Sequence, residues 1–373
     1  MSPKNVTPTK VLIAGGGTGG HLAPGIAVAD VLRAKGCKVV FVSRGNELER
    51  RMLGRAGYPL KTIWIEGLKG RGLKNKLVTL FKLPVSGWQS LWLILKMRPK
   101  VVIGLGSYSS GPVIIAAWLL RRKIALMESN AVAGITNRLC GRFAKKIFVS
   151  FEDAERYFDQ GKCVFSGNPV RKEFFEGLDE PVAKSAKFTV LILGGSQGAH
   201  ALNELVAQSL QHLNNRESLR YIHQTGAHDA ETMRENYALY GVEAEVAEFY
   251  DDVARKYQAA DFVICRAGAT TIAELTALGK AAFFVPFPQA ADNHQEKNAM
   301  VMVKAGAAMM GRERELNGKD LARVVNNQTR NVLTFGGPPR YAPHTSRWRT
   351  SSAVMARKIF RLCSDLVRAA SMV

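Results

Sequence analysis

Clustered metal ligands and paired cysteines are missing from this sequence of 373 residues. Its five cysteines are scattered, and none forms a CxxC pair or a cluster with histidine. An odd, unclustered set favours neither a disulfide framework nor a zinc site, and it suits a reducing cytoplasm. No Asp-x-Asp pair follows a predicted strand. We therefore predict no cofactor and no obligatory metal site.

Long apolar runs are also missing. No segment approaches the ~18–20 apolar residues that a membrane span needs, and the nearest candidate, Leu91–Leu95, is followed by Lys96. The first residues, MSPKNVTPTK, are polar, contain two prolines and show no secretory signal. The sequence thus predicts neither a membrane span nor export, and we interpret residues 1–9 as a flexible arm.

Two common nucleotide-binding signatures are incomplete or absent. Gly15–Gly20 fits GxGxxG, but the next predicted strand ends Phe41-Val42-Ser43-Arg44 and lacks the acid that holds a ribose in dinucleotide sites. The P-loop pattern GxxxxGK[ST] does not occur. The glycine turn still places backbone N–H groups at the start of a predicted helix, where we expect them to attract anions and polar sugar groups.

Acidic residues are scarce in the first half of the chain. Residues 1–166 hold 27 Lys and Arg but only 9 Asp and Glu, whereas residues 167–330 hold 18 and 21, within a net charge of +21. The basic half is therefore expected to meet nucleic acid, a phosphate-rich ligand or an acidic membrane. No recognised nucleic-acid motif accompanies the charge, so nucleic acid is the weakest of the three.

A repeated segment divides the chain into two halves. Val11–His21 reads VLIAGGGTGGH and Val190–His200 reads VLILGGSQGAH, with seven of eleven positions identical. In both halves short apolar runs alternate with amphipathic stretches, which predicts parallel sheets covered by helices on both faces. The predicted strands are 11–14, 39–42, 101–105, 124–127 and 147–149 in the first half, and 190–193, 219–223, 246–249, 262–265 and 281–285 in the second.

These patterns predict an α/β protein with two doubly wound, Rossmann-like domains that face each other across a cleft. Ligands of such sheets bind beyond the carboxyl ends of the strands, so the cleft is the expected active site. The predicted organisation is an arm at 1–9, domains at 10–167 and 188–330, a linker at 168–187 and a basic tail at 331–373.

His21 is the candidate catalytic base. It follows five glycines in six residues at a predicted helix start, and a neutral imidazole can take a proton from an attacking hydroxyl near neutral pH. In the second half, the backbone of the GGSQG turn and the Ser196 hydroxyl suit a diphosphate. His200, one turn into the following helix, is interpreted as structural.

Two acidic residues at strand ends each allow two interpretations. Glu274 forms either a capping box with Thr271 or a bidentate acceptor for the vicinal hydroxyls of a ribose. Asp292 is either a simple helix N-cap or part of a polar cluster with Gln295 that suits a sugar with several hydroxyls.

Eight motifs occur in an order that is typical of one family. They are HLAPGIAVA (His21–Ala29), GSYSSGP (Gly106–Pro112), ESNAVAGITNRL (Glu128–Leu139), GNPVR (Gly167–Arg171), GGSQGA (Gly194–Ala199), EFYDD (Glu248–Asp252), CRAGATTIAEL (Cys265–Leu275) and DNHQEKNA (Asp292–Ala299). Through them the chain resembles the MurG family of bacterial GT-B glycosyltransferases, which build peptidoglycan. The resemblance implies an inverting, metal-independent hexosyltransferase. It would move N-acetylglucosamine from UDP-N-acetylglucosamine to the muramoyl 4-hydroxyl of lipid I, giving lipid II.

The resemblance also implies the site residues. His21 and Glu128 are the catalytic candidates, and either is a candidate for the base. The implied donor contacts are Thr18, Gly19 and Gly20 beside the sugar and diphosphate; Asn130 and Gln295 at sugar hydroxyls; Arg171 and Ser196 at the phosphates, with Gln197 beside them; Tyr250 near uracil; Ala269, Thr270 and Thr271 along the nucleotide; and Glu274 at the ribose. Tyr250 stands where the family commonly has isoleucine, and the family pattern HEQN is here Met127-Glu128-Ser129-Asn130.

The implied acceptor accounts for the charge of the first half. Lipid I carries a pyrophosphate and lies in an anionic bilayer, and between Lys69 and Lys100 basic residues alternate with leucine, phenylalanine and tryptophan. We therefore expect a peripheral protein on the cytoplasmic face of the plasma (inner) membrane, with other cell-wall synthesis proteins as candidate partners. Two alternatives stay open: a GT-B sugar transferase with another acceptor, and a sugar-nucleotide epimerase-like enzyme.

The tail from Asn331 departs from the family pattern, which normally closes with a helix rich in alanine, glutamate and arginine. Thr334–Ser352 is rich in Pro, Arg, Ser and Thr. We expect this segment to be disordered, as a divergent tail or the product of an altered reading frame.

Overall fold

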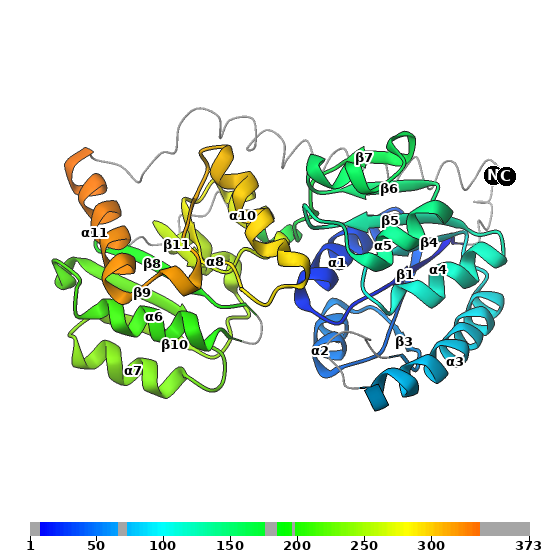
Figure 1. The fold of residues 1–373 in the computed structure, drawn as a ribbon, viewed down its shortest axis with the longest axis horizontal. Coiled ribbons are helices and arrows are strands. Elements are labelled where there is room, and N and C mark those ends of the chain that lie inside the picture. The colour runs from blue at the N-terminus through cyan, green and yellow to red at the C-terminus, as the bar shows by residue number, and fades with distance from the viewer. Residues whose placement is uncertain (1–7, 66–72, 176–184, 196–197, 336–373) are drawn as a thin grey trace, which may run out of the picture. The chain divides into compact units, whose positions relative to one another are not determined.

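Two compact units make up the described part of the chain (Figure 1). The computed structural model describes residues 8–65, 73–175, 185–195 and 198–335, without the side chains of 73–81 and 331–335. The first unit ends at Arg171 and the second begins at Lys172. Residues 1–7, Lys69 and Arg71, residues 176–184 of the predicted linker, Ser196, Gln197 and the tail from residue 336 lie outside the described residues, together with the expectations attached to them. The sequence predicts a tail that begins at Asn331 and is disordered from Thr334, but residues 331–335 are the end of a helix that begins at Gly318.

The first unit is built on a seven-stranded parallel sheet in the order β3-β2-β1-β4-β5-β6-β7. Its strands are β1 (Lys10–Ala14), β2 (Lys38–Ser43), β3 (Leu60–Thr62), β4 (Val101–Gly104), β5 (Lys123–Glu128), β6 (Lys146–Val149) and β7 (Cys163–Phe165). The apolar runs predict the five inner strands and miss β3 and β7. Both missed strands have three residues and lie at the sheet edges without a fully buried residue, so no apolar run marks them.

Successive residues of the inner strands pack on opposite faces of this sheet. Val11 and Ile13 of β1 belong to one apolar core, whereas Leu12 and Ala14 belong to the other. The helices that complete the first core are α1 (Gly19–Ala34) and α2 (Glu47–Ala56), and those of the second are α3 (Leu73–Met97), α4 (Ser110–Leu119) and α5 (Ile135–Cys140). Both faces are thus covered, as expected for a doubly wound sheet.

The second unit has a six-stranded parallel sheet in the order β10-β9-β8-β11-β12-β13. Its strands are β8 (Phe188–Leu193), β9 (Leu219–Gln224), β10 (Glu243–Ala247), β11 (Phe262–Cys265), β12 (Ala282–Phe284) and β13 (Met309–Met310), and its helices are α6 (His200–Leu210), α7 (Ala230–Leu239), α8 (Val253–Ala259), α9 (Ala269–Leu278), α10 (His294–Lys304) and α11 (Gly318–Phe335). The prediction of a strand at 246–249 is misplaced, because the edge strand β10 carries Glu243 and Glu245 and reads as polar. The two-residue β13 was not predicted.

The repeated segment occupies corresponding places in the two units. β1 lies between β2 and β4, and β8 lies between β9 and β11. Each is followed by a glycine turn and a helix, α1 or α6. The predicted fold class of two parallel, Rossmann-like sheets is therefore confirmed, and the repeat is the strand–turn–helix element at the centre of each.

Candidate active site

In the first glycine turn (residues 15–20), the first three N–H groups donate hydrogen bonds to other parts of the protein. Gly15 N–H donates to the Val42 carbonyl at 3.0 Å. Gly16 N–H donates to Ser107 Oγ at 3.0 Å, and Gly17 N–H donates to Glu49 Oε1 at 2.6 Å. The expectation that the N–H groups of this turn attract an anion is therefore wrong for Gly15, Gly16 and Gly17, whose N–H groups have protein acceptors, one of them a carboxylate. For Thr18, Gly19 and Gly20 it stays a prediction.

Thr18 and His21 lie where the turn becomes helix. Thr18 is the extended N-cap of α1, and its carbonyl accepts from His21 N–H at 3.3 Å and Leu22 N–H at 3.2 Å. Gly19 and Gly20 are the first two helical residues, so His21 follows within the first turn. Its side chain is half-buried. The position of His21 is thus set directly by the glycine turn.

Glu128 ends β5 and organises the loop that follows. Its side chain is 3% exposed. Oε1 accepts from Asn130 N–H at 3.0 Å, and Oε2 accepts from Gly134 N–H at 3.0 Å and Asn137 Nδ2 at 2.9 Å. Burial raises the pKa of Glu128, and the donors from Asn130, Asn137 and Gly134 oppose that rise. Both oxygens thus already accept hydrogen bonds from the loop, and the choice between His21 and Glu128 as the base stays a prediction.

The predicted sugar and phosphate contacts of the first unit lie next to this loop. Ser129 Oγ donates to Asn168 Oδ1 at 3.2 Å, which joins the ESN motif to the GNPVR motif. Asn130, whose N–H is held by Glu128, and Arg171, three residues after Asn168, are both half-buried. The segments that carry Glu128, Asn130 and Arg171 are therefore connected through the Ser129–Asn168 hydrogen bond.

The second glycine turn (residues 194–198) is fitted closely to its neighbours. Gly198 has φ +78°, and a Cβ there would collide with the Thr225 carbonyl, so glycine is required. Gln224, at the end of β9, donates from Nε2 to the Gly195 carbonyl at 3.0 Å and accepts from Tyr250 N–H at 3.0 Å. One side chain thus joins the turn to the EFYDD segment.

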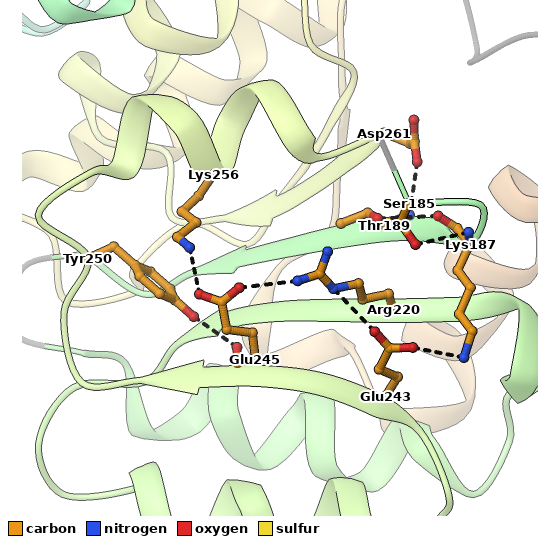
Figure 2. Close-up of polar contacts among 9 residues, drawn as sticks. All are labelled: Ser185, Lys187, Thr189, Arg220, Glu243, Glu245, Tyr250, Lys256 and Asp261. Atoms are coloured by element: carbon orange, nitrogen blue, oxygen red, sulfur yellow. Dashed lines mark hydrogen bonds and ion pairs between the residues drawn. The ribbon is translucent and has the colours of Figure 1, made fainter. Parts of the chain in front are cut away.

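Tyr250 lies beside Lys256 and Glu245 (Figure 2). Its side chain is 7% exposed, and its hydroxyl donates to the Glu245 carbonyl at 2.8 Å. The ammonium of Lys256 lies 4.9 Å from the ring centre. A chain of ion pairs extends from there across the sheet through Lys256, Glu245, Arg220, Glu243 and Lys187. Little of this side chain is exposed for a base to stack on, and the position of Tyr250 near uracil stays a prediction.

Behind the second turn, a hydrogen-bond network runs from the core to the start of α6. His223 is fully buried, with Nδ1 3.0 Å from Tyr237 Oη and Nε2 3.0 Å from Asn203 Oδ1. Asn203 Nδ2 donates to Asp229 Oδ2 at 2.6 Å, and Asp229 Oδ1 lies 2.9 Å from His200 Nδ1. The structural interpretation of His200 agrees with this pairing.

Glu274 is not part of a capping box. The N-cap of α9 is Gly268, no side chain caps the helix, and Thr271 is the third helical residue. Glu274 is buried and accepts from Tyr257 Oη at 3.3 Å. The capping interpretation is therefore wrong, and the ribose role stays a prediction; Ala269, Thr270 and Thr271 form the first turn of the same helix.

Asp292 is not an N-cap either. α10 begins at His294 after Asn293, and Asp292 and Asn293 both have left-handed φ values, 55° and 53°. Gln295 Oε1 accepts from Phe287 N–H at 3.0 Å, which orients its amide group. Consecutive left-handed residues of this kind are concentrated at ligand sites, which keeps the sugar role of Gln295 a candidate.

The sequence analysis assigns no role to Glu49, Ser107 or Gln224, which form hydrogen bonds with the two glycine turns. Asn46-x-x-Glu49 is a readable capping-box pattern, and Ser107 lies inside the GSYSSGP motif. For Gln224 the sequence gives no local signal. Among the described residues, no group of three or more His, Cys, Asp or Glu is placed to hold a metal ion.

Known proteins resemble both units. The Glycosyltransferase family 28 N-terminal domain matches residues 11–149, and the family 28 C-terminal domain matches residues 189–335. The UDP-N-acetylglucosamine–N-acetylmuramyl-(pentapeptide) pyrophosphoryl-undecaprenol N-acetylglucosamine transferase of Myxococcus xanthus is 45% identical over 85% of this chain and 83% of its own length. The enzyme of the same name from Anaeromyxobacter sp. is 46% identical over 96% of this chain and 94% of its own length.

A solved structure agrees with these relatives. The crystal structure of Acinetobacter baumannii MurG has a TM-score of 0.69 and 30% sequence identity, covering 97% of this chain and 100% of its own. Fold, motif order and sequence identity therefore lead to one assignment. The chain belongs to glycosyltransferase family 28, in the MurG family of N-acetylglucosamine transferases.

Proposed function

We propose that this enzyme transfers N-acetylglucosamine from UDP-N-acetylglucosamine to the lipid-linked muramoyl-pentapeptide, lipid I, in peptidoglycan synthesis. The observation that carries the proposal is identity above 40% over most of the chain to transferases of that name. An acceptor other than lipid I, or an epimerase-like activity, is not favoured by these relatives.

The second unit would hold the nucleotide. The start of α6 would supply helix N–H groups for the diphosphate. Glu274 of α9, which is buried and accepts from the Tyr257 hydroxyl of α8, would accept from the ribose hydroxyls. Gln224, bound to both the Gly195 carbonyl and Tyr250 N–H, would hold the second glycine turn and the EFYDD segment in fixed positions relative to each other. Gln295 of this unit is a candidate contact for the sugar hydroxyls. In the first unit, Asn130 is a candidate for the sugar hydroxyls and Arg171 for the phosphates.

The reaction would be an inverting displacement at the sugar. His21 takes the proton of the muramoyl 4-hydroxyl, the oxygen forms a bond to the anomeric carbon, and the bond from that carbon to the diphosphate breaks. UDP leaves with the electron pair of that bond. Arg171 and the N-terminus of α6 would stabilise its developing charge without an obligatory metal.

The first unit would lie against an anionic membrane surface. On α3 and the adjacent α4, Trp88, Trp92 and Trp118 are 71%, 56% and 50% exposed. The Lys96 ammonium lies 4.8 Å from the Trp92 ring centre, and exposed aromatic and basic side chains together suit a lipid interface. No helix in the described part of the chain has the length and apolarity to span a membrane. We place the enzyme on the cytoplasmic face of the inner membrane.

Transfer of labelled N-acetylglucosamine to a lipid I analogue tests the function directly. We expect a lipid II analogue with inverted anomeric configuration, formed equally well in EDTA. No product from lipid I would refute the proposed acceptor. Loss of activity in EDTA that only a divalent ion restores would refute the metal-independent step.

A further inference from the structure

Three side chains form hydrogen bonds with the first glycine turn, just before His21. Ser107 Oγ accepts from Gly16 N–H at 3.0 Å. Glu49 Oε1 accepts from Gly17 N–H at 2.6 Å, and Asn46 Nδ2 donates to the Gly17 carbonyl at 3.2 Å. The peptide groups on both sides of Gly17 are therefore fixed from α2.

Among these three side chains, Glu49 contributes a buried carboxylate. Its side chain is 1% exposed, and its second oxygen accepts from Asn46 N–H at 2.7 Å. A Cβ at Gly16 would collide with Glu49 Oε1, so the turn and the carboxylate are in direct contact. Hydrogen bonds to an ionised acceptor are roughly twice as strong as neutral ones.

Helix capping alone does not account for the position of Glu49. A capping box needs Asn46 Oδ1 to accept from Glu49 N–H and one Glu49 oxygen to accept from Asn46 N–H, and both bonds are present. In the second unit, Asn317 and Asp320 make the same reciprocal pair at α11. The Glu49 oxygen bound to Gly17 is additional to the cap.

We propose that Glu49 is a positioning residue for glycosyl transfer, holding the Gly17 peptide so that Thr18 and His21 keep their places at the start of α1. The inference rests on the proposed function, in which His21 takes the acceptor proton. Gly17 is bonded directly to Thr18, whose carbonyl receives the His21 N–H. A shift of the turn therefore moves His21, and about 1 Å of misplacement of a reacting group can cost about a hundredfold in rate.

The test compares Glu49→Gln with two matched controls. The variant removes the charge and places an NH2 group against one of the two backbone donors. Glu47→Gln makes the same change at an exposed residue of the same helix. Asp320→Asn weakens the equivalent cap of α11, in which the Asp320 carboxylate accepts from Asn317 N–H. We measure kcat, the KM for UDP-N-acetylglucosamine, the Kd for UDP and the melting temperature.

We expect Glu49→Gln to lower kcat by about ten- to a hundredfold, with donor KM and UDP Kd within about twofold of the wild type. Both controls should keep kcat within about twofold. A purely structural role would instead lower UDP binding and kcat together, in step with the melting temperature. A kcat for Glu49→Gln within twofold of the wild type would overturn the inference.

A second variant decides the case if Glu49→Gln does not fold. Asn46→Ser keeps a capping oxygen for Glu49 N–H but loses the donor to the Gly17 carbonyl. It should lower kcat severalfold at unchanged UDP Kd, and an unchanged kcat would overturn the inference. Failure of the wild-type enzyme to transfer the sugar would refute the proposed function itself, an outcome distinct from equal rates in wild type and variant.

Discussion

Acid should destabilise the second unit through His223. Burial lowers the pKa of this imidazole to about 3, from an ordinary value of 6.5. Asn203 uses its NH2 group on Asp229 and on the Thr225 carbonyl, so its oxygen faces His223 and must accept from Nε2–H. Nδ1 then accepts from the Tyr237 hydroxyl. The neutral ring satisfies both contacts, and protonation would give Nδ1 a hydrogen that faces this hydroxyl.

The magnitude follows from the two pKa values. Between pH 6.5 and about 3 the unfolded chain binds a proton at this histidine and the folded chain does not, so stability falls as the pH falls. At about 1.4 kcal/mol per pH unit, the loss between pH 7 and pH 4 is about 3 kcal/mol. Stability is regained above pH 6.5, where both states are neutral.

Amide hydrogen exchange of β9 at the two pH values measures this loss. His223→Gln removes the titrating group, and the difference in opening free energy between pH 7 and pH 4 should shrink by about 3 kcal/mol, whatever the variant costs at pH 7. His212→Gln, the same substitution at an exposed histidine of the second unit, is the control. Equal pH dependence in the wild type and His223→Gln would refute the reasoning.

Three further predictions concern the active site and the membrane. His21→Ala should lower kcat by about 10²- to 10⁴-fold if His21 is the general base, with UDP affinity retained; near-normal turnover would exclude that role. Glu274→Gln should weaken UDP binding by roughly ten- to a hundredfold, because a hydrogen bond to a charged group contributes about 1.5–3 kcal/mol. Calorimetry measures this loss, and the affinity for inorganic pyrophosphate, which has no ribose, should not change. Replacing Trp88 and Trp92 with serine should reduce binding to anionic vesicles at least about tenfold, since each buried aromatic side chain contributes roughly 1.5–3 kcal/mol. Turnover on a short-chain soluble acceptor should be spared, and an equal loss on both acceptors would place the tryptophans in the fold or active site instead.

The inner strands and the motif-bearing turns could be predicted from the sequence because their signals are local. Val11–Ala14 and Val190–Leu193 are uninterrupted apolar runs that end at glycines, and in the structure each is an inner strand of its sheet. The edge strand β10 could not be placed in the same way. Its alternating glutamates pair with Arg220, Lys187 and Lys256, and only Ala244 and Val246 pack against the core, so no apolar run marks this strand.

Contacts between side chains and groups that are distant in the sequence could not be predicted for a different reason. Asn46-x-x-Glu49 and Thr271-x-x-Glu274 fit the same capping pattern, yet only the first is a capping box. In α9 the helix already begins at Ala269, so Thr271 lies inside it and Glu274 is left to contact Tyr257. A pattern four residues long does not record where the helix starts or which distant N–H group a side chain reaches.

The two glycine turns show how one sequence motif can support two tasks. In the first, the N–H groups of Gly15, Gly16 and Gly17 are bound by the protein, and the carboxylate of Glu49 comes from a helix 32 residues away. An incoming phosphate would meet that carboxylate, and like charges repel. In the second, Gly198 N–H donates to the Gly195 carbonyl at 3.2 Å, and Gln224, a neutral side chain, binds the same carbonyl. We therefore propose that the first turn holds His21 in place and that the second binds the diphosphate of the donor.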